Sequence, residues 1–298
     1  MMPNATARYM PNFAPTQWYM RIARFFSYSI PAMLIIAVFI APVLQSNEAV
    51  ILTQAFFYLV LAGATLLEAA RLPGGSLMAS GLLTTRQTPQ HLAVGATVAG
   101  ALMFVIAGSS LAAGATAHAV SPLVFSPVMV VGLIVSSMGE EVLFRGTIMQ
   151  ALQQRFGTYV SVVVTSALFA SMHLGNPHVE PLAIVSTFMI GLLFGMMAVL
   201  TSSLWMSMSF HVVWNLLSAG IFGEVSGLPP VWQFMNIDTT TVIVPQWIFG
   251  GNYGIESGVI TIVFTLIMCF VVPKYCTLDP FARAARYRID VCNPSHNQ

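Results

Sequence analysis

The sequence predicts an all-α fold, a polytopic transmembrane helical bundle of about eight spans with both termini in the cytoplasm. Of the 298 residues, 57% are hydrophobic and 7% are charged, whereas a soluble domain carries about 25% charged residues. Apolar runs of about 20 residues, the length that an α-helix needs to cross a bilayer, recur along the chain. The formal net charge is only +1, and no nucleic-acid partner is expected.

The apolar runs divide the chain into a membrane domain and two short flanking segments. We expect a cytoplasmic N-terminal segment at 1–28, an eight-span membrane domain at 29–273 and a cytoplasmic C-terminal tail at 274–298. Pro31 and Pro42 lie inside the first span, so its ends are the least well defined. The predicted spans are 29–45, 49–69, 92–112, 123–148, 158–175, 181–200, 203–222 and 255–273.

The positions of the cationic residues orient these spans. With eight spans, all eleven Lys and Arg residues fall on one side of the membrane, and the opposite loops carry acidic residues but no Lys or Arg. Positively charged loops are retained in the cytoplasm, so this side is predicted to be cytoplasmic. The eleven residues are Arg8, Arg21, Arg24, Arg71, Arg86, Arg145, Arg155, Lys274, Arg283, Arg286 and Arg288.

One outer connection, 223–254, is long and contains Trp232, Trp247 and Tyr253. Aromatic side chains of this kind gather where the membrane meets water. The connection is therefore predicted to lie in the outer interface as an aromatic anchor, with substrate gating as the alternative role.

A small set of polar residues interrupts the otherwise apolar spans. Each charged side chain near the bilayer centre costs about 2.5–3.5 kcal/mol on insertion scales, so each needs a reason. Glu68 lies close to a span end and is interpreted as interfacial. The remaining residues are Glu140, Glu141, Arg145, His173, His211 and Asn215.

Spans four and five form a predicted hairpin that brings two of these residues to the same depth. Gly157 is a typical helix stop and marks the turn. Glu140 and His173 lie equally far before and after the midpoint between Phe156 and Gly157. Because antiparallel helices rise equally per residue, the two side chains should lie at a similar level.

Helical spacing assigns roles to the remaining polar residues. His211 and Asn215 are four residues apart and share one face of span seven. Arg145 lies four residues after Glu141, which is the spacing of an ion pair, so we expect a buried structural pair there. This leaves Glu140 as the freer carboxylate, facing the same level as the two histidines.

These residues resemble the three motifs of the CPBP family, the CAAX proteases and bacteriocin-processing enzymes also called Abi. The family pattern EExxxR corresponds to residues 140–145, FxxxH to 169–173 and HxxxN to 211–215, within a motif core at 125–222. The resemblance, which includes the type II CAAX prenyl endopeptidases, implies an intramembrane endopeptidase. It implies that Glu140 and His173 activate water and that His211 and Asn215 stabilise the oxyanion.

A metal-free reaction is favoured, so no cofactor is expected. Glu140, His173 and His211 would nevertheless supply the two imidazoles and one carboxylate of a catalytic zinc site, and this alternative stays open. The sequence has no HExxH motif, and an asparagine is a poor fourth ligand. The three cysteines show no metal-ligand spacing.

The expected partners are the lipid bilayer and a membrane-associated protein or peptide substrate, which the resemblance allows to be prenylated. We expect an integral protein of the bacterial inner membrane whose active site is accessible from the cytoplasmic side. Intramembrane carboxylates and histidines also build proton relays. A proton-coupled transporter and a non-proteolytic immunity or interaction protein therefore remain alternatives.

Overall fold

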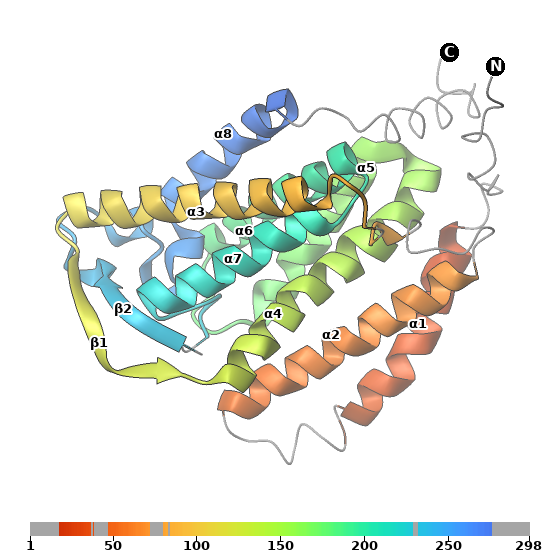
Figure 1. The fold of residues 1–298 in the computed structure, drawn as a ribbon, viewed down its shortest axis with the longest axis horizontal. Coiled ribbons are helices and arrows are strands. Elements are labelled where there is room, and N and C mark those ends of the chain that lie inside the picture. Colours follow the sequence, from red (N-terminus) through yellow and green to blue (C-terminus); the bar gives the residue numbers. More distant parts are fainter. Residues whose placement is uncertain are drawn as a thin grey trace.

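The computed structural model describes residues 18–36, 38, 47–71, 80–82, 84–228 and 232–275, and these residues form mainly helices (Figure 1). The predicted helical class is therefore confirmed. Seven-residue η5 (Val142–Ile148), a π-helix, joins α4 to α5 without a break. The α-helices are α1 (Trp18–Ile35), α2 (Asn47–Ala70), α3 (Thr88–Ala112), α4 (Pro127–Glu141), α5 (Met149–Met172), α6 (Pro181–Thr201), α7 (Trp205–Phe222) and α8 (Val259–Tyr275).

Several helices have the length and composition of membrane spans. Four helical stretches qualify among the described residues, namely 52–70, 88–112, 127–175 and 181–201, and α8 is a shorter apolar helix. Large apolar side chains point outward from them, as with Phe104 and Phe270, which are 80% and 72% exposed. Such a surface is stable in lipid and not in water, so the chain is an integral membrane protein. The count of eight spans and the cytoplasmic termini stay predictions.

The 127–175 stretch is a hairpin and not one long helix. Gly157 has φ 77° and ψ 176°, a conformation that ends a helix. The rings of Phe144 and Phe169 are 5.3 Å apart, whereas a continuous helix would separate them by about 37 Å. The chain therefore reverses at Gly157, as predicted.

A small antiparallel sheet is the main departure from the predicted all-α fold. Strand β1 (Thr116–Phe125) pairs with β2 (Trp232–Asp238), with Thr116 opposite Asp238 and Phe125 opposite Trp232. The prediction that span four begins at 123 is therefore wrong: its helix begins at Pro127, where proline suits the first helical turn. Because the two strands lie far apart in the chain, no local sequence pattern predicts their pairing.

Other boundaries also differ from the prediction. Helix α1 begins at Trp18, well before the predicted start of span one at residue 29. Glu68 is not a solvated interfacial residue, because it is 1% exposed and forms ion pairs with Arg21 at 3.3 Å and Arg24 at 3.1 Å. These pairs join α1 to α2. Residues 1–17 and 276–298 lie outside the described residues, and the second range holds all of the predicted tail except residues 274 and 275, which belong to α8.

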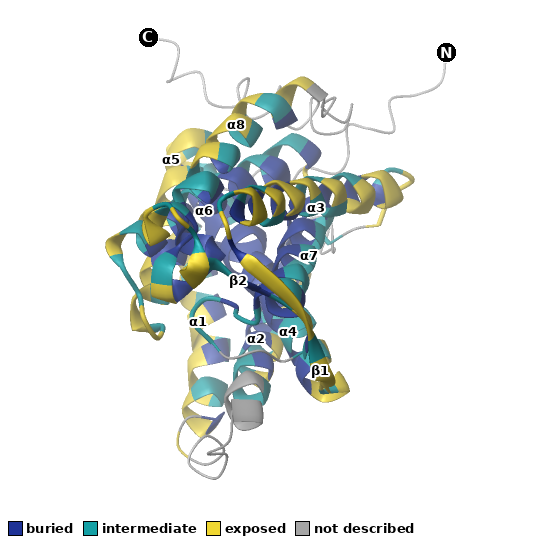
Figure 2. Ribbon diagram, turned by 90° about the vertical axis from the view of Figure 1, so that its left-hand side faces the viewer, coloured by how far each residue is buried: buried dark blue, intermediate teal, exposed yellow. Residues whose placement is uncertain are grey.

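Close helix contacts explain the glycines of the core. A Cβ atom on Gly95 of α3 would lie 2.2 Å from the Met206 carbonyl oxygen of α7. A Cβ on Gly139 of α4 would lie 2.3 Å from the Cβ of Tyr58 in α2. Figure 2 shows the most buried residues on α6 and α7 at the centre, while β1 is exposed. Helix α7 is thus held from several sides.

The outer connection folds over the bundle in short turns. After β2 the chain forms the 3₁₀ turns η7 (Thr239–Thr241), η8 (Gln246–Ile248), η9 (Gly251–Tyr253) and η10 (Ile255–Ser257). Trp247 is 50% exposed, which suits an interfacial residue, but Tyr253 is completely buried. The predicted anchoring role is therefore wrong for Tyr253, which points into the protein.

Candidate active site

The predicted pair of Glu141 and Arg145 is present and completely buried. Arg145 donates from Nη1 to Oε1 of Glu141 at 2.9 Å and from Nη2 to the Gly191 carbonyl at 3.0 Å. The second bond joins η5, which contains Arg145, to α6. An unpaired buried guanidinium would be costly, so this pair is a structural requirement of the site.

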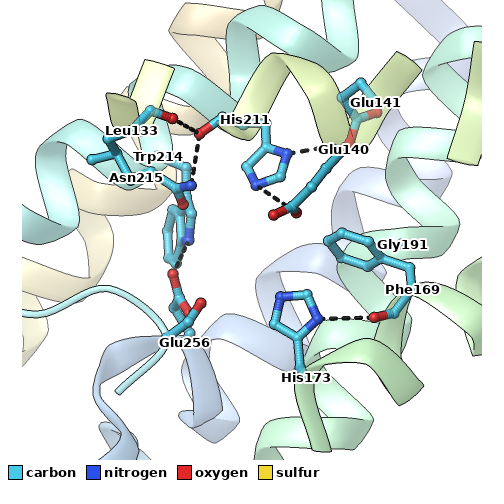
Figure 3. Close-up of polar contacts among 12 residues, drawn as sticks. Leu133, Glu140, Glu141, Phe169, His173, Gly191, His211, Trp214, Asn215 and Glu256 are labelled. Atoms are coloured by element: carbon cyan, nitrogen blue, oxygen red, sulfur yellow. Dashed lines mark hydrogen bonds and ion pairs between the residues drawn. The ribbon is translucent and has the colours of Figure 1, made fainter. Parts of the chain in front are cut away.

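Glu141 has a second partner that the sequence did not suggest. Its Oε1 atom accepts a hydrogen bond from Nδ1 of His211 at 3.2 Å, and Nε2 of His211 lies 3.7 Å from Oε2 of Glu140 (Figure 3). Because a carboxylate can only accept, Nδ1 of His211 carries a proton. Nε2 is the imidazole atom that Glu140 faces. Adjacent glutamates thus hold one histidine from both ends.

His173 lies across the site from this pair, at the end of α5 (Figure 3). Its Nδ1 atom is 2.8 Å from the carbonyl oxygen of Phe169, one turn earlier. A carbonyl accepts only, so the proton of neutral His173 is on Nδ1 and the lone pair is on Nε2. His173 is half-buried. It therefore presents a basic nitrogen to the site.

The aromatic residue of the FxxxH motif, Phe169, packs against both histidines. The ring of Phe169 lies 4.8 Å from that of His173 and 6.1 Å from that of His211, measured between centroids. The guanidinium carbon of Arg145 is 4.7 Å from the same ring, within the range of a cation–π contact. Phe169 thus positions three polar side chains by packing.

Asn215 lies one turn beyond His211 on the same face of α7, as its spacing predicts. Its Nδ2 atom donates to the hydroxyl of Ser137 at 2.9 Å. The neighbouring residue Trp214 donates from Nε1 to Oε1 of Glu256 at 3.1 Å. Helix α7 is therefore bonded to α4 on one side and to η10 on another.

Tyr58 of α2 is a site residue that sequence reasoning missed. Its side chain lies against Gly139 and its hydroxyl is hydrogen-bonded to the carboxylate of Glu140. Tyr58 is buried. A tyrosine in an apolar span gives no signal of its own, because aromatic residues are common in membrane helices. Only the contact with Glu140 distinguishes it.

Residues of the outer connection and of η10, which directly follows it, are bonded to one another beside the site. Glu256 accepts from Ser226 at 2.6 Å, and the Tyr253 hydroxyl accepts from Asn176 at 3.2 Å, three residues beyond His173. Glu224 lies beside this group, and burial together with the charge of Glu256 raises its pKa to about 7. Burial likewise raises the pKa of Tyr253. The residues beside the site are therefore polar, and burial favours the uncharged forms of Glu224 and Tyr253.

A metal ion would need several carboxylate or imidazole ligands that converge on one point of the site. Among the described residues, no group of three or more His, Cys, Asp or Glu side chains is arranged so that it could hold a metal ion. A catalytic zinc ion needs three converging protein ligands. Nδ1 of His173 and Nδ1 of His211 are both engaged by oxygen atoms of the protein, which leaves Nε2 as the only ring atom of each that could bind a metal. Glu140, His173 and His211 do not form such a group among the described residues, and the metal-free reaction stays a prediction.

Comparison with known families agrees with the motifs. Residues 122–217 match the family model described as "Type II CAAX prenyl endopeptidase Rce1-like", and this range contains all three motifs. The resemblance to the CPBP family is thereby confirmed over this segment, and it supports a protease acting on a membrane-associated peptide. No curated protein matches the chain.

Proposed function

We propose that this membrane protein is an intramembrane endopeptidase that hydrolyses a peptide bond of a membrane-associated substrate. The observation that supports the proposal is that Glu140 and His211 lie 3.7 Å apart, with Asn215 one turn beyond and His173 across the site from them, in otherwise apolar helices (Figure 3). The match of residues 122–217 to CAAX prenyl endopeptidases supports the same reaction class. Processing of a prenylated C-terminus or maturation of a membrane peptide are the substrate classes that we favour.

The residues supply each requirement of amide hydrolysis. Water must lose a proton, the developing oxyanion must be held by donors, and the leaving amine must gain a proton. We assign the first task to Glu140 and His173, whose Nε2 carries a lone pair. The water oxygen then bonds to the carbonyl carbon, the C–N bond breaks, and the same proton passes to the amine.

His211 and Asn215 are assigned to the oxyanion. An asparagine amide donates without any change of charge, whereas His211 must be protonated for Nε2 to donate, because Nδ1 already donates to Glu141. With His211 protonated, the two cations Arg145 and His211 balance the two anions Glu140 and Glu141. Buried charges are stable only when paired, so this balance supports the assignment.

An apolar groove supports a substrate that is attached to lipid. It lies between α2 and α4, has a volume of about 370 Å³, and is lined by residues such as Leu52, Phe56 and Val135. Val135 is one turn from Gly139, which contacts Tyr58, the partner of Glu140. A substrate tail in this groove would be near the proposed catalytic carboxylate.

The proposed reaction needs no metal and takes place on the cytoplasmic side of a bacterial inner membrane. The side follows from the positive-inside distribution of the Lys and Arg residues. A metal-free enzyme should keep its activity after treatment with a strong chelator. Activity that the chelator removes and added zinc restores would overturn this part of the proposal.

The central test compares wild type with Glu140→Gln, expressed at equal levels in cells that lack the native protein. Mass spectrometry of new peptide termini should detect products with wild type that are absent with the variant, a loss of about 10³-fold or more for a removed catalytic group. Glu180→Gln, the same change on an outer acidic residue, is the matched control and should cleave as wild type does. A prenylated CAAX peptide serves as the purified test substrate.

The outcomes separate the proposed functions. Identical termini in wild type and Glu140→Gln, together with an intact test peptide, would contradict the protease. Proton-coupled flux in liposomes that depends on Glu140 would then favour a transporter.

A further inference from the structure

Helices α4 and α7 are joined by a ladder of side-chain contacts that includes one residue without an assigned role. Glu140 of α4 lies opposite His211 of α7 at 3.7 Å. One turn further along, Ser137 lies opposite Asn215, with 2.9 Å between its hydroxyl oxygen and Nδ2. Moving toward the start of α4 corresponds to moving toward the end of α7, as in any antiparallel pair. Ser137 therefore contacts the proposed oxyanion donor directly.

The hydrogen bonds of Ser137 fix the direction of this contact. Its hydroxyl donates to the carbonyl oxygen of Leu133 at 2.8 Å, and Figure 3 shows the bonds that run from Leu133 to Asn215. A hydroxyl has one proton, so the oxygen of Ser137 can only accept from Asn215. The amide group of Asn215 must then present NH₂ to Ser137, and not its carbonyl oxygen.

The orientation of the amide decides whether Asn215 can serve the reaction. Nitrogen and oxygen of an asparagine amide have nearly the same shape, so only the hydrogen-bond network selects between the two flipped states. In the state that Ser137 selects, one N–H bonds to Ser137 and the second N–H of the same group remains to donate. In the opposite state, the Ser137 oxygen would lose its donor and would face the carbonyl oxygen of Asn215.

We infer that Ser137 is a positioning residue that holds the Asn215 amide in the flip state able to donate to the oxyanion. This inference rests on the proposed protease function and deepens it. Ser137 is 1% exposed and acts through Asn215 without touching the substrate. Its removal should therefore lower kcat and leave KM nearly unchanged, because the amide is needed in the transition state.

The experiment is a double-mutant cycle on cleavage of the prenylated CAAX test peptide by the purified full chain. Ser137→Ala should lower kcat roughly 5- to 10-fold, the value of one hydrogen bond. Asn215→Ala should lower kcat about 10²- to 10³-fold. In the Asn215→Ala background, Ser137→Ala should cause no further loss, because no amide remains to be oriented. Ser137→Thr keeps the hydroxyl and should restore most of kcat.

Ser136→Ala is the matched control, since Ser136 is also buried on α4 and its hydroxyl has no hydrogen-bond partner among the described residues. This variant should keep the wild-type kcat, and thermal unfolding should show that all variants fold. No loss with Ser137→Ala, or an equal loss in both backgrounds, would overturn the inference while the protease stands. Wild-type kcat in Asn215→Ala would overturn it together with the oxyanion assignment. No cleavage of the test peptide by wild type, together with identical peptide termini in wild-type and Glu140→Gln cells, would instead refute the proposed function itself.

Discussion

At the scale of single residues, each histidine of the site has its ring orientation set by an oxygen atom that accepts from Nδ1. The Phe169 carbonyl fixes the proton of His173, and the Glu141 carboxylate fixes that of His211. Backbone and carboxylate oxygens thus give the two histidines the same Nδ1-protonated form and different surroundings. His173 faces the site with a lone pair, whereas His211 faces a carboxylate. Different roles for the two imidazoles follow from this difference.

Glu224, just after α7, gives the stability of the protein a pH dependence. Its pKa is raised from the ordinary value of 4.5 to about 7 by burial and by the charge of Glu256. The folded state therefore holds a proton that the unfolded chain has released, and this stabilises the fold fully below pH 4.5. The contribution is lost as the pH rises through about 7. In wild type, the unfolding temperature should fall between pH 5 and pH 8.

Glu224→Gln keeps a neutral side chain at every pH and should weaken that fall. At pH 8 we expect it to unfold a few degrees above wild type, measured by thermal unfolding in detergent. Asp238→Asn is the control, because hydrogen bonds from Thr240 lower the pKa of the exposed Asp238 below its ordinary value of 3.8. Asp238→Asn should keep the wild-type slope. The same slope in Glu224→Gln would contradict the assignment of the titrating group.

At the scale of elements, α7 is the helix on which the site depends. It carries His211 and Asn215, contacts α3 through Gly95, and is bonded to η10 through Trp214 and Glu256. Because every contact of α7 also sets the position of its polar face, a shift of this helix would move both residues at once. Packing far from the chemistry should therefore affect activity.

Gly95→Ala tests the dependence on α7. The added Cβ would lie 2.2 Å from the Met206 carbonyl oxygen and 3.0 Å from the Phe210 nitrogen, both backbone atoms that cannot rotate away. We expect a loss of about 1–3 kcal/mol in unfolding free energy, the usual cost of overpacking, and lower cleavage activity. Gly100→Ala lies on the same helix with no atom within 4 Å of the new Cβ. It should be neutral or slightly stabilising, and an equal loss in both variants would contradict a specific contact.

At the scale of the whole molecule, local periodicity predicted the helices, but it did not predict how the β1–β2 sheet and the outer connection pack against them. The hairpin at Gly157 and the Glu141–Arg145 pair were predictable, because helix geometry alone sets them. The β1–β2 sheet, the inward position of Tyr253 and the bond from Tyr58 to Glu140 join segments far apart in the chain. Such pairings depend on tertiary packing, which no single stretch of sequence encodes.

The two ends of the bundle also predict how the protein sits in the membrane. Helix α4 begins beside the sheet at Pro127 and continues through η5 into α5, so the turn at Gly157 lies about 45 Å from the sheet. Figure 1 places the sheet and this turn at opposite ends. Arg155 is at the turn end, whereas Glu224 and Asp238 are at the sheet end. The positive-inside rule then puts the turn in the cytoplasm.

Cysteine labelling with a membrane-impermeant maleimide tests this orientation. In a background without Cys269, Cys276 and Cys292, single cysteines replace Tyr159 near the turn and Ile243 beyond the sheet, which are 86% and 87% exposed. Ile243→Cys should react in right-side-out vesicles and Tyr159→Cys only in inverted ones, because the bilayer separates the two ends. The reverse pattern would put the proposed site on the opposite face from its predicted access. Labelling of both from one side would contradict a hairpin that spans the bilayer.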